Sequence, residues 1–474
     1  MFCDHPPDEK GPVVRQKFLL ATPAVSRRRL PALLACLMLT LAAALPTAAA
    51  AQEPKKDDDQ PVEDPNRKAA NISWNPKLTF DEWKALDKVR FIEFDRKLGT
   101  AALTDAEKKP LLKHLQNQIN GLTLEQNVDR HAIIVDNITR AAEHPSTSPA
   151  VREFVYENAL KLVESLLKDQ PPNVQYSLVL LVSRLNAKAP NLTARPPVPS
   201  QPYPPSQELL KRVLVTDPPM PISVRIIAAR GLERLMRDGD ISTVDKSQIG
   251  ETLAMGLKQK VDNPLARKWY RWKLVEGLGA TGRYEETGYK PVMIDALMSV
   301  LTNPQDDWEV RAAAARSISQ LPLDQKVNVE LVNYEVVRFL HDLAVAYSAS
   351  DKTPPSTWRW AFDNVYLAYK APTAADQTVK HWGLMHLNTP RGREQINAAY
   401  KNVVLPVVKP ILESQALPAI DAAKIKALSD WLKSNAVTDR KVTPGSGDLK
   451  APAGAPPQAV QQPNGTAAAG AAGN

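Results

Sequence analysis

Cysteine is nearly absent from this sequence. The 474 residues contain two cysteines, Cys3 and Cys36, and both precede the segment in which we expect the folded protein to begin. A folded part without cysteine excludes a disulfide scaffold, a thiol enzyme and a zinc site built from cysteine ligands. Its stability must therefore come from packing and hydrogen bonding alone.

Catalytic motifs are missing as well. The chain has no GxSxG nucleophile elbow and no GxxxxGK[ST] phosphate loop. The glycine-rich run Gly277–Gly282 follows a predicted helix rather than a strand, so it is typical of a helix end and a turn. His381 and His386 are five residues apart and would not share a helix face. We therefore predict a non-enzyme with no catalytic residue, no cofactor and no metal site.

A strong excess of one charge is also lacking. The formal net charge is +8, but without residues 1–51 the count is 54 Lys or Arg against 49 Asp or Glu, a net charge of +5. Both signs are mixed along the chain, with no basic block of the kind that binds nucleic acid. This pattern argues against a nucleic-acid partner.

The first 51 residues have the pattern of a secretory signal peptide. The basic run Arg27–Arg29 precedes the apolar, alanine-rich run Leu30–Leu45, and small residues follow. We expect cleavage near Ala50 or Ala51 and export of a bacterial protein to the periplasm or the exterior. The apolar run is shorter than the roughly 20 residues that a membrane span needs, so we expect no stable span after cleavage.

Other interpretations of this leader stay open. The run ending at Cys36 resembles a lipoprotein cleavage site, but almost no apolar segment precedes it. The run from Ser26 resembles a twin-arginine export signal, although ordinary export signals also carry arginines. The long stretch before Ser26 leaves the true start of the protein open.

Composition divides the rest of the chain. Residues 52–73 are charged and proline-containing, and residues 438–474 are mostly Gly, Ala, Pro and Gln, so both segments are predicted to be disordered. Between them we predict an N-terminal helical cap over 74–149, helix-pair repeats over 150–371 and a C-terminal helical cap over 372–437.

A recurring helix is the strongest pattern in the chain. Four segments align on Arg225, Arg267, Arg311 and Arg359, which are 42, 44 and 48 residues apart. A period near 40–47 residues is typical of two-helix solenoid repeats. Positions −1, +3, +7 and +10 from each arginine should share one apolar face. They are Val224, Ala228, Leu232 and Leu235; Ala266, Tyr270, Leu274 and Gly277; Val310, Ala314, Ile318 and Leu321; and Trp358, Phe362, Tyr366 and Tyr369.

Shorter apolar helices precede these segments and complete the pairs. Gln175 stands in the arginine position of one further segment, which makes five pairs between about 150 and 370. The predicted first helices are Val151–Leu167, Glu208–Val215, Gln248–Lys258, Pro291–Leu301 and Leu331–Tyr347. A proline-rich loop follows the Gln175 helix, and one more pair is expected over 104–143. We therefore predict an all-α fold, an α-α superhelix with disordered ends.

The small-residue helix that opens with valine and arginine resembles the HEAT repeat, including the HEAT-like repeats of the phycobilisome-lyase type. This resemblance to HEAT and armadillo-like solenoids implies an architecture and no particular activity. It also implies a ladder in which aspartates before each arginine tie the turns between repeats. The candidates for that ladder are Asp217, Asp262, Asp306, Asp307 and Asp351.

In the HEAT resemblance, second helices line the concave side, and positions +1, +4 and +5 from each arginine would point outward. The candidate partner-binding residues are Arg230, Lys268, Arg271, Trp272, Arg316, Trp360 and Asn364. Arginine and aromatic residues are enriched in binding hot spots, although they also fill gaps and solvate exposed helix faces.

The sequence thus favours an exported, non-enzymatic scaffold that binds a protein or an acidic envelope component. The alternatives are a ligand-binding or lyase-like HEAT-repeat enzyme and a structural protein of the cell envelope. The partner and the oligomeric state stay open.

Overall fold

The computed structural model describes residues 74–87, 103–145, 147–191, 193–195, 197–370, 383–387 and 392–449. The predicted signal peptide over 1–51, the linker over 52–73 and the last part of the tail lie outside the described residues, as does His381. Within the described part, no helix is both long and apolar enough to cross a membrane.

Nearly every element in the described residues is a helix, so the prediction of an all-α fold is confirmed. The α-helices are α2 (Phe80–Asp87), α4 (Asp105–Gly121), α5 (His131–Glu143), α6 (Pro149–Leu167), α7 (Pro172–Arg184), α8 (Ser206–Val215), α9 (Ile222–Asp238), α10 (Thr243–Leu257), α11 (Pro264–Ala280), α12 (Val292–Thr302), α13 (Trp308–Ser319), α14 (Val329–Ala349), α15 (Pro355–Tyr369), α16 (Arg393–Ala399), α17 (Leu405–Glu413) and α18 (Ala422–Ser434). The 3-10 helices η2 (Glu125–Arg130) and η4 (Leu384–His386) and the π-helix η5 (Tyr400–Val404) complete them.

The proline-rich insertion differs from the expected loop. It contains two short antiparallel strands, β1 (Asn186–Lys188) and β2 (Gln201–Pro202). Tyr203, next to β2, is buried, and its hydroxyl donates to Glu153 Oε1 of α6 at 2.6 Å. These contacts fix the insertion against the helices.

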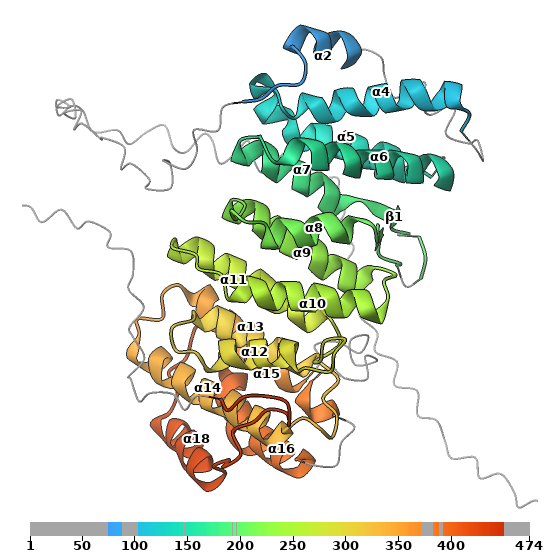
Figure 1. Cartoon of the computed structure of the whole chain (residues 1–474). Coiled ribbons are helices and arrows are strands. Elements are labelled where there is room, and N and C mark those ends of the chain that lie inside the picture. The colour runs from blue at the N-terminus through green and yellow to red at the C-terminus, as the bar shows by residue number, and fades with distance from the viewer. Residues whose placement is uncertain are drawn as a thin grey trace, which may run out of the picture. The chain divides into compact units, whose positions relative to one another are not determined.

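The helices pack as consecutive pairs in two layers (Figure 1). One layer contains α4, α6, α8, α10, α12 and α14, and each of these contacts the next along the chain. The other contains α5, α7, α9, α11, α13, α15 and α17, again in contact from neighbour to neighbour. This array contains the five predicted pairs and the additional pair α4–α5. Helix α17 ends the second layer, and α16 and α18 pack against α14.

Helix starts follow local sequence rules. Thr104 and Glu107 form the expected capping box at the start of α4. Proline occupies a first-turn position of α6, α7, α11 and α15, where the backbone amide would lack an intrahelical partner anyway. The sequence therefore sets where many of the helices begin.

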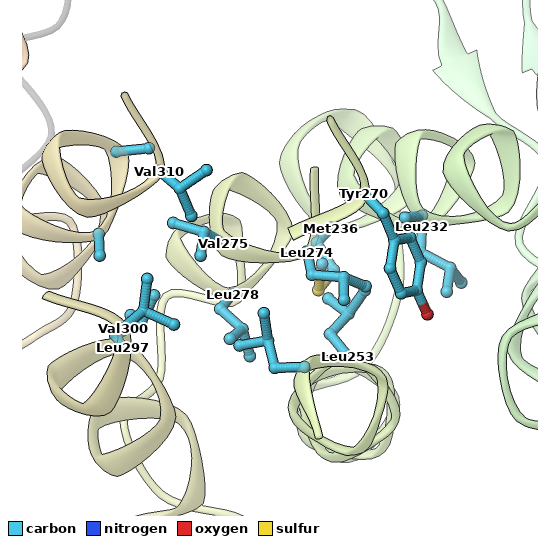
Figure 2. Packing of buried hydrophobic residues seen from close by; sticks show 14 of the residues in the cluster. Leu232, Met236, Leu253, Tyr270, Leu274, Val275, Leu278, Leu297, Val300 and Val310 are labelled. Carbon is cyan, nitrogen blue, oxygen red and sulfur yellow. The ribbon is translucent and has the colours of Figure 1, made fainter. Parts of the chain in front are cut away.

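The predicted apolar faces form the seam between the layers. Figure 2 shows Leu232 of α9, Leu253 of α10 and Leu274 of α11 meeting in one buried cluster. Full burial of such a side chain contributes about 1.5–3 kcal/mol. Gly277 is the exception among the aligned positions because a Cβ there would lie 2.8 Å from Cδ1 of Leu253. Leu253 thus occupies the space that the α11 side chain would need.

The C-terminal tail begins later than predicted. Residues 438–449 were expected to be disordered, but the structure folds them against α12 and α14. The backbone N–H of Asn328 donates to the Val442 carbonyl at 2.7 Å, and Ser446 Oγ donates to Asp295 Oδ1 at 2.6 Å. Arg440 pairs with the buried Glu335 carboxylate at 2.7 Å. Specific polar contacts and one buried valine hold this segment despite its low overall hydrophobicity.

Candidate functional site

The seven candidate binding residues all lie on four neighbouring helices of the second layer. Arg230 lies on α9, and Lys268, Arg271 and Trp272 lie on α11. Arg316 lies on α13, and Trp360 and Asn364 lie on α15. The structure therefore brings them onto adjacent helices, although their environments differ sharply.

Arg271 is committed to contacts within the fold. Its Nε donates to Asp306 Oδ1 at 2.5 Å and its Nη2 donates to Oδ2 at 2.7 Å, while Nη1 donates to the Leu257 carbonyl at 2.7 Å. The Asp306 side chain is only 6% exposed. This bidentate pair links the end of α10 to the turn before α13.

Lys268 likewise pairs with a carboxylate of the chain, that of Glu309. The Glu309 side chain is buried and Lys268 is half-buried. The two cations predicted at the start of α11 therefore connect one repeat to the next.

In three of the described pairs, the side chain at the aligned position contacts the end of the first helix, directly or through one glutamine. Arg311 Nε donates to the Leu301 carbonyl of α12 at 3.0 Å, and Gln175 Nε2 donates to the Leu167 carbonyl of α6 at the same distance. Arg225 donates to Gln259 Oε1 at 2.5 Å, and that amide donates onward to the Leu214 carbonyl of α8. A donor placed there satisfies orphan carbonyls, and a cation also complements the helix dipole.

One candidate aspartate of the ladder, Asp306, forms a buried ion pair with a neighbouring repeat. Asp306 pairs with Arg271 instead of with an aligned arginine. Asp217 and Asp262 are exposed, and the carboxylate of Asp262 pairs with Lys260 at 3.3 Å. Arg311 and Arg359 donate to backbone carbonyls, and Arg311 also lies 3.6 Å from the Asp342 carboxylate.

A tryptophan cluster, which we define as Trp269, Trp272 and Trp360, covers part of this face. The rings of Trp269 and Trp272 are stacked, with centroids 5.0 Å apart and planes 5° apart. The Trp360 ring lies 4.1 Å from that of Trp272 at 57°. Trp269 remains 44% exposed, and Leu265, one turn earlier on α11, is exposed as well. Apolar surface thus accumulates at the start of α11.

A pocket of about 360 Å³ opens on the same helices toward their C-terminal ends. Its lining residues are Glu233, Met236 and Arg237 of α9, Lys246 of α10, Glu276, Gly279 and Ala280 of α11, Gly282 after α11, Ala313, Arg316 and Ser317 of α13, Gln320 directly after α13, and Asn364 of α15. A Cβ on Gly279 would lie 2.4 Å from Gln320 Oε1. Glycine is thus needed for the close approach of α11 and α13 at this wall.

Two carboxylates, Glu233 and Glu276, line the pocket from α9 and α11. Burial raises the pKa of the Glu233 carboxyl above its ordinary value, and the charge of Glu276 raises it further. The opposing cations are Lys273, Arg237 and Arg230. Arg237 pairs with Glu233 at 2.9 Å, and Lys273 pairs with Glu276.

Asn364 contributes an unusual polar atom to this pocket. The residue is 1% exposed, and its Nδ2 donates to the Trp360 carbonyl at 2.8 Å. Its buried Oδ1 has no hydrogen-bond partner among the described residues. A buried acceptor without a donor is costly.

The sequence indicated part of this site and missed the rest. Arg316 and Asn364 of the predicted set line the pocket, whereas Trp272 and Trp360 belong to the tryptophan cluster. Glu233, Glu276 and Gln320 were not predicted because only the packing of α9, α11 and α13 brings them together. Among the described residues, no group of His, Cys, Asp and Glu is placed to hold a metal ion.

Comparisons with known proteins do not assign the chain to a family. No protein-family model, no curated protein and no solved structure matches the chain.

Proposed function

We propose that this protein is an exported, non-enzymatic α-solenoid that binds another protein through the tryptophan cluster. The observation that carries the proposal is the stacking of the exposed Trp269 on the half-buried Trp272. Tryptophan is the residue type most enriched in protein-binding hot spots, and exposed apolar patches mark interaction surfaces.

The cluster is suited to binding because its geometry is already fixed. Trp272 contacts both other rings, so a partner that covers Trp269 would meet a side chain with little freedom left to lose. The paired state of Lys268 and Arg271 makes an acidic envelope component a weaker candidate. Those cations are already neutralised within the chain, so an apolar patch on a protein fits this end of the face better.

Affinity capture from the cell-envelope fraction tests this function. The substitution Trp269→Ala should abolish most of the capture of any specific partner, because removing a hot-spot residue costs about 2 kcal/mol or more. Tyr289→Ala is the matched control, since Tyr289 is an exposed aromatic residue, 74% accessible, that precedes α12. Equal capture by both variants would contradict binding at the cluster.

Export is part of the same proposal and is supported by the leader sequence. N-terminal sequencing of the protein from its native cells should find a start near Gln52. A native protein that retains the run Leu30–Leu45 would instead support a membrane anchor.

A further inference from the structure

The segment over 438–449 contacts α12 and α14 as a bound peptide would. It forms a small turn closed on itself: Lys441 and Asp448 pair as an antiparallel bridge, and the Leu449 N–H donates to the Arg440 carbonyl at 3.0 Å. A turn that is closed by its own hydrogen bonds has little conformational freedom left to lose when it binds a surface. Its contacts with the helices therefore resemble those of a ligand that is already in its bound shape.

Asn328, at the start of α14, contacts the main chain of this turn at three carbonyls. Its backbone N–H donates to the Val442 carbonyl at 2.7 Å, and its Nδ2 donates to the Asp439 and Lys441 carbonyls at 3.3 and 3.4 Å. Its Oδ1 accepts from the Leu331 N–H at 3.1 Å, which caps α14 and fixes the Asn328 side chain. Contacts to the main chain provide affinity without selecting side chains.

Three side chains of the segment provide selectivity. Arg440 pairs with the buried Glu335 carboxylate at 2.7 Å. Ser446 Oγ donates to Asp295 Oδ1 at 2.6 Å, and the Val442 side chain is buried. A cation, an apolar side chain and a hydroxyl group thus each have a complementary place on the helices, in this order along the segment.

The receiving surface keeps its charges balanced when the segment leaves. Glu335 also pairs with Arg338, one turn later on α14, at 2.5 Å, so the buried carboxylate retains one cation without Arg440. Ala436 and Thr438, which lie between α18 and the segment, are exposed. Release of the segment therefore breaks few contacts apart from those that hold the turn itself.

We propose that α12 and α14 carry a peptide-recognition site, which residues 438–449 occupy in cis and which a matching turn of a partner protein can occupy in their place. The matching turn has a cationic residue, a valine two positions later and a hydroxyl residue four positions after the valine, as in Arg440, Val442 and Ser446. The tether gives the cis segment an effective concentration on the order of millimolar. A free ligand therefore binds well only when the cis segment is weakened.

The test is binding of a fluorescent peptide with the sequence of residues 438–449 to the full chain, followed by anisotropy. The variant Arg440→Ala with Ser446→Ala weakens the cis segment and leaves the helices unchanged, so it should bind the peptide at least about tenfold more tightly than the wild type. A peptide with Arg440→Ala should bind this variant about tenfold more weakly than the unchanged peptide. Lys441→Ala in the peptide is the matched control and should change nothing, because the Lys441 side chain is exposed.

Two results would overturn the proposal. One is a variant chain that binds the unchanged peptide no better than the wild type does. The other is equal binding of the Arg440→Ala and Lys441→Ala peptides, since the pair with Glu335 would then select nothing.

A second measurement uses the wild-type chain and does not depend on how the variant folds. The peptide at about 10 mM should displace the cis segment and speed deuterium exchange at the Leu449 N–H and at the Ser446 N–H, which donates to the Thr443 carbonyl at 3.0 Å. Unchanged exchange at this concentration would contradict displacement. Trp269→Ala should leave peptide binding unchanged, because Trp269 lies on α11, so this proposal and the proposed function can fail separately.

Discussion

The pair α10–α11 and the pair α12–α13 solve the same structural problem with different residues. In α13 the aligned Arg311 is 3% exposed, donates to the end of α12 and lies over the rings of Trp308 and Phe339. In α11 the aligned Arg267 is exposed, and Arg271, one turn later, donates to the end of α10. These two pairs therefore keep the contact of a cation with the end of the first helix, although the position of the arginine differs.

The largest predicted effect separates the two aligned arginines. Arg311→Ala should lower the free energy of unfolding by about 3 kcal/mol, because it removes a buried cation and leaves the Leu301 carbonyl without its donor. Arg267→Ala should change it by less than about 0.5 kcal/mol, as is usual for exposed positions. Urea unfolding followed by circular dichroism measures both variants, and equal losses would refute the comparison.

A smaller effect is expected at Arg271. Arg271→Ala should cost about 2 kcal/mol, because it leaves the buried Asp306 carboxylate without its bidentate partner. In a double-mutant cycle with Asp306→Ala, the combined loss should be clearly smaller than the sum of the two single losses. Additive losses would mean that the two side chains contribute to stability independently. That result would contradict a link between the repeats through this ion pair.

The smallest effect concerns the carboxylates between α9 and α11. The pKa of Glu233 is raised above its ordinary value of 4.5, so the folded protein binds this proton more tightly than the unfolded chain. The resulting stability is fully present below the ordinary pKa and is lost as the pH rises through the folded value. Glu233→Gln removes this loss, so the variant should melt at a higher temperature than the wild type at about pH 7 and at nearly the same temperature at about pH 4.

The exposed Glu208 provides the control for that measurement. Glu208→Gln, at an exposed position of α8, is measured beside it. A lower melting temperature for Glu233→Gln at neutral pH would mean that the pair with Arg237 outweighs the cost of burial.

The helix pairs could be predicted from the sequence because their cause is local. Leu232, Leu274 and Ile318 recur at the same offset from an arginine, and the structure buries all three. The spacing of apolar residues identifies the apolar face of each helix from its own sequence. The order of the helix pairs could therefore be predicted from the order of these segments in the chain. The first helices also began within a few residues of their predicted starts.

The candidate site could be predicted only in part because it depends on contacts between helices. Arg230, Trp272, Arg316 and Asn364 all stand at position +5, yet Arg230 is exposed and Asn364 is buried. The period places all four on the outward side of their helices but does not show how closely the next helix packs. The pairing of Arg271 with Asp306 has the same origin, since 35 residues separate its partners.

The segment over 438–449 affects the order in which the chain can fold. Contacts within and between neighbouring pairs span few residues, so the pairs up to α11 can form as soon as they are synthesised. Ser446 and Asp295 are 151 residues apart, and Arg440 and Glu335 are 105 residues apart (440 − 335). The contacts of α12 and α14 with this segment can therefore form only after residues 438–449 have been synthesised. Until then a nascent chain presents Asp295 and the Glu335 carboxylate without these partners.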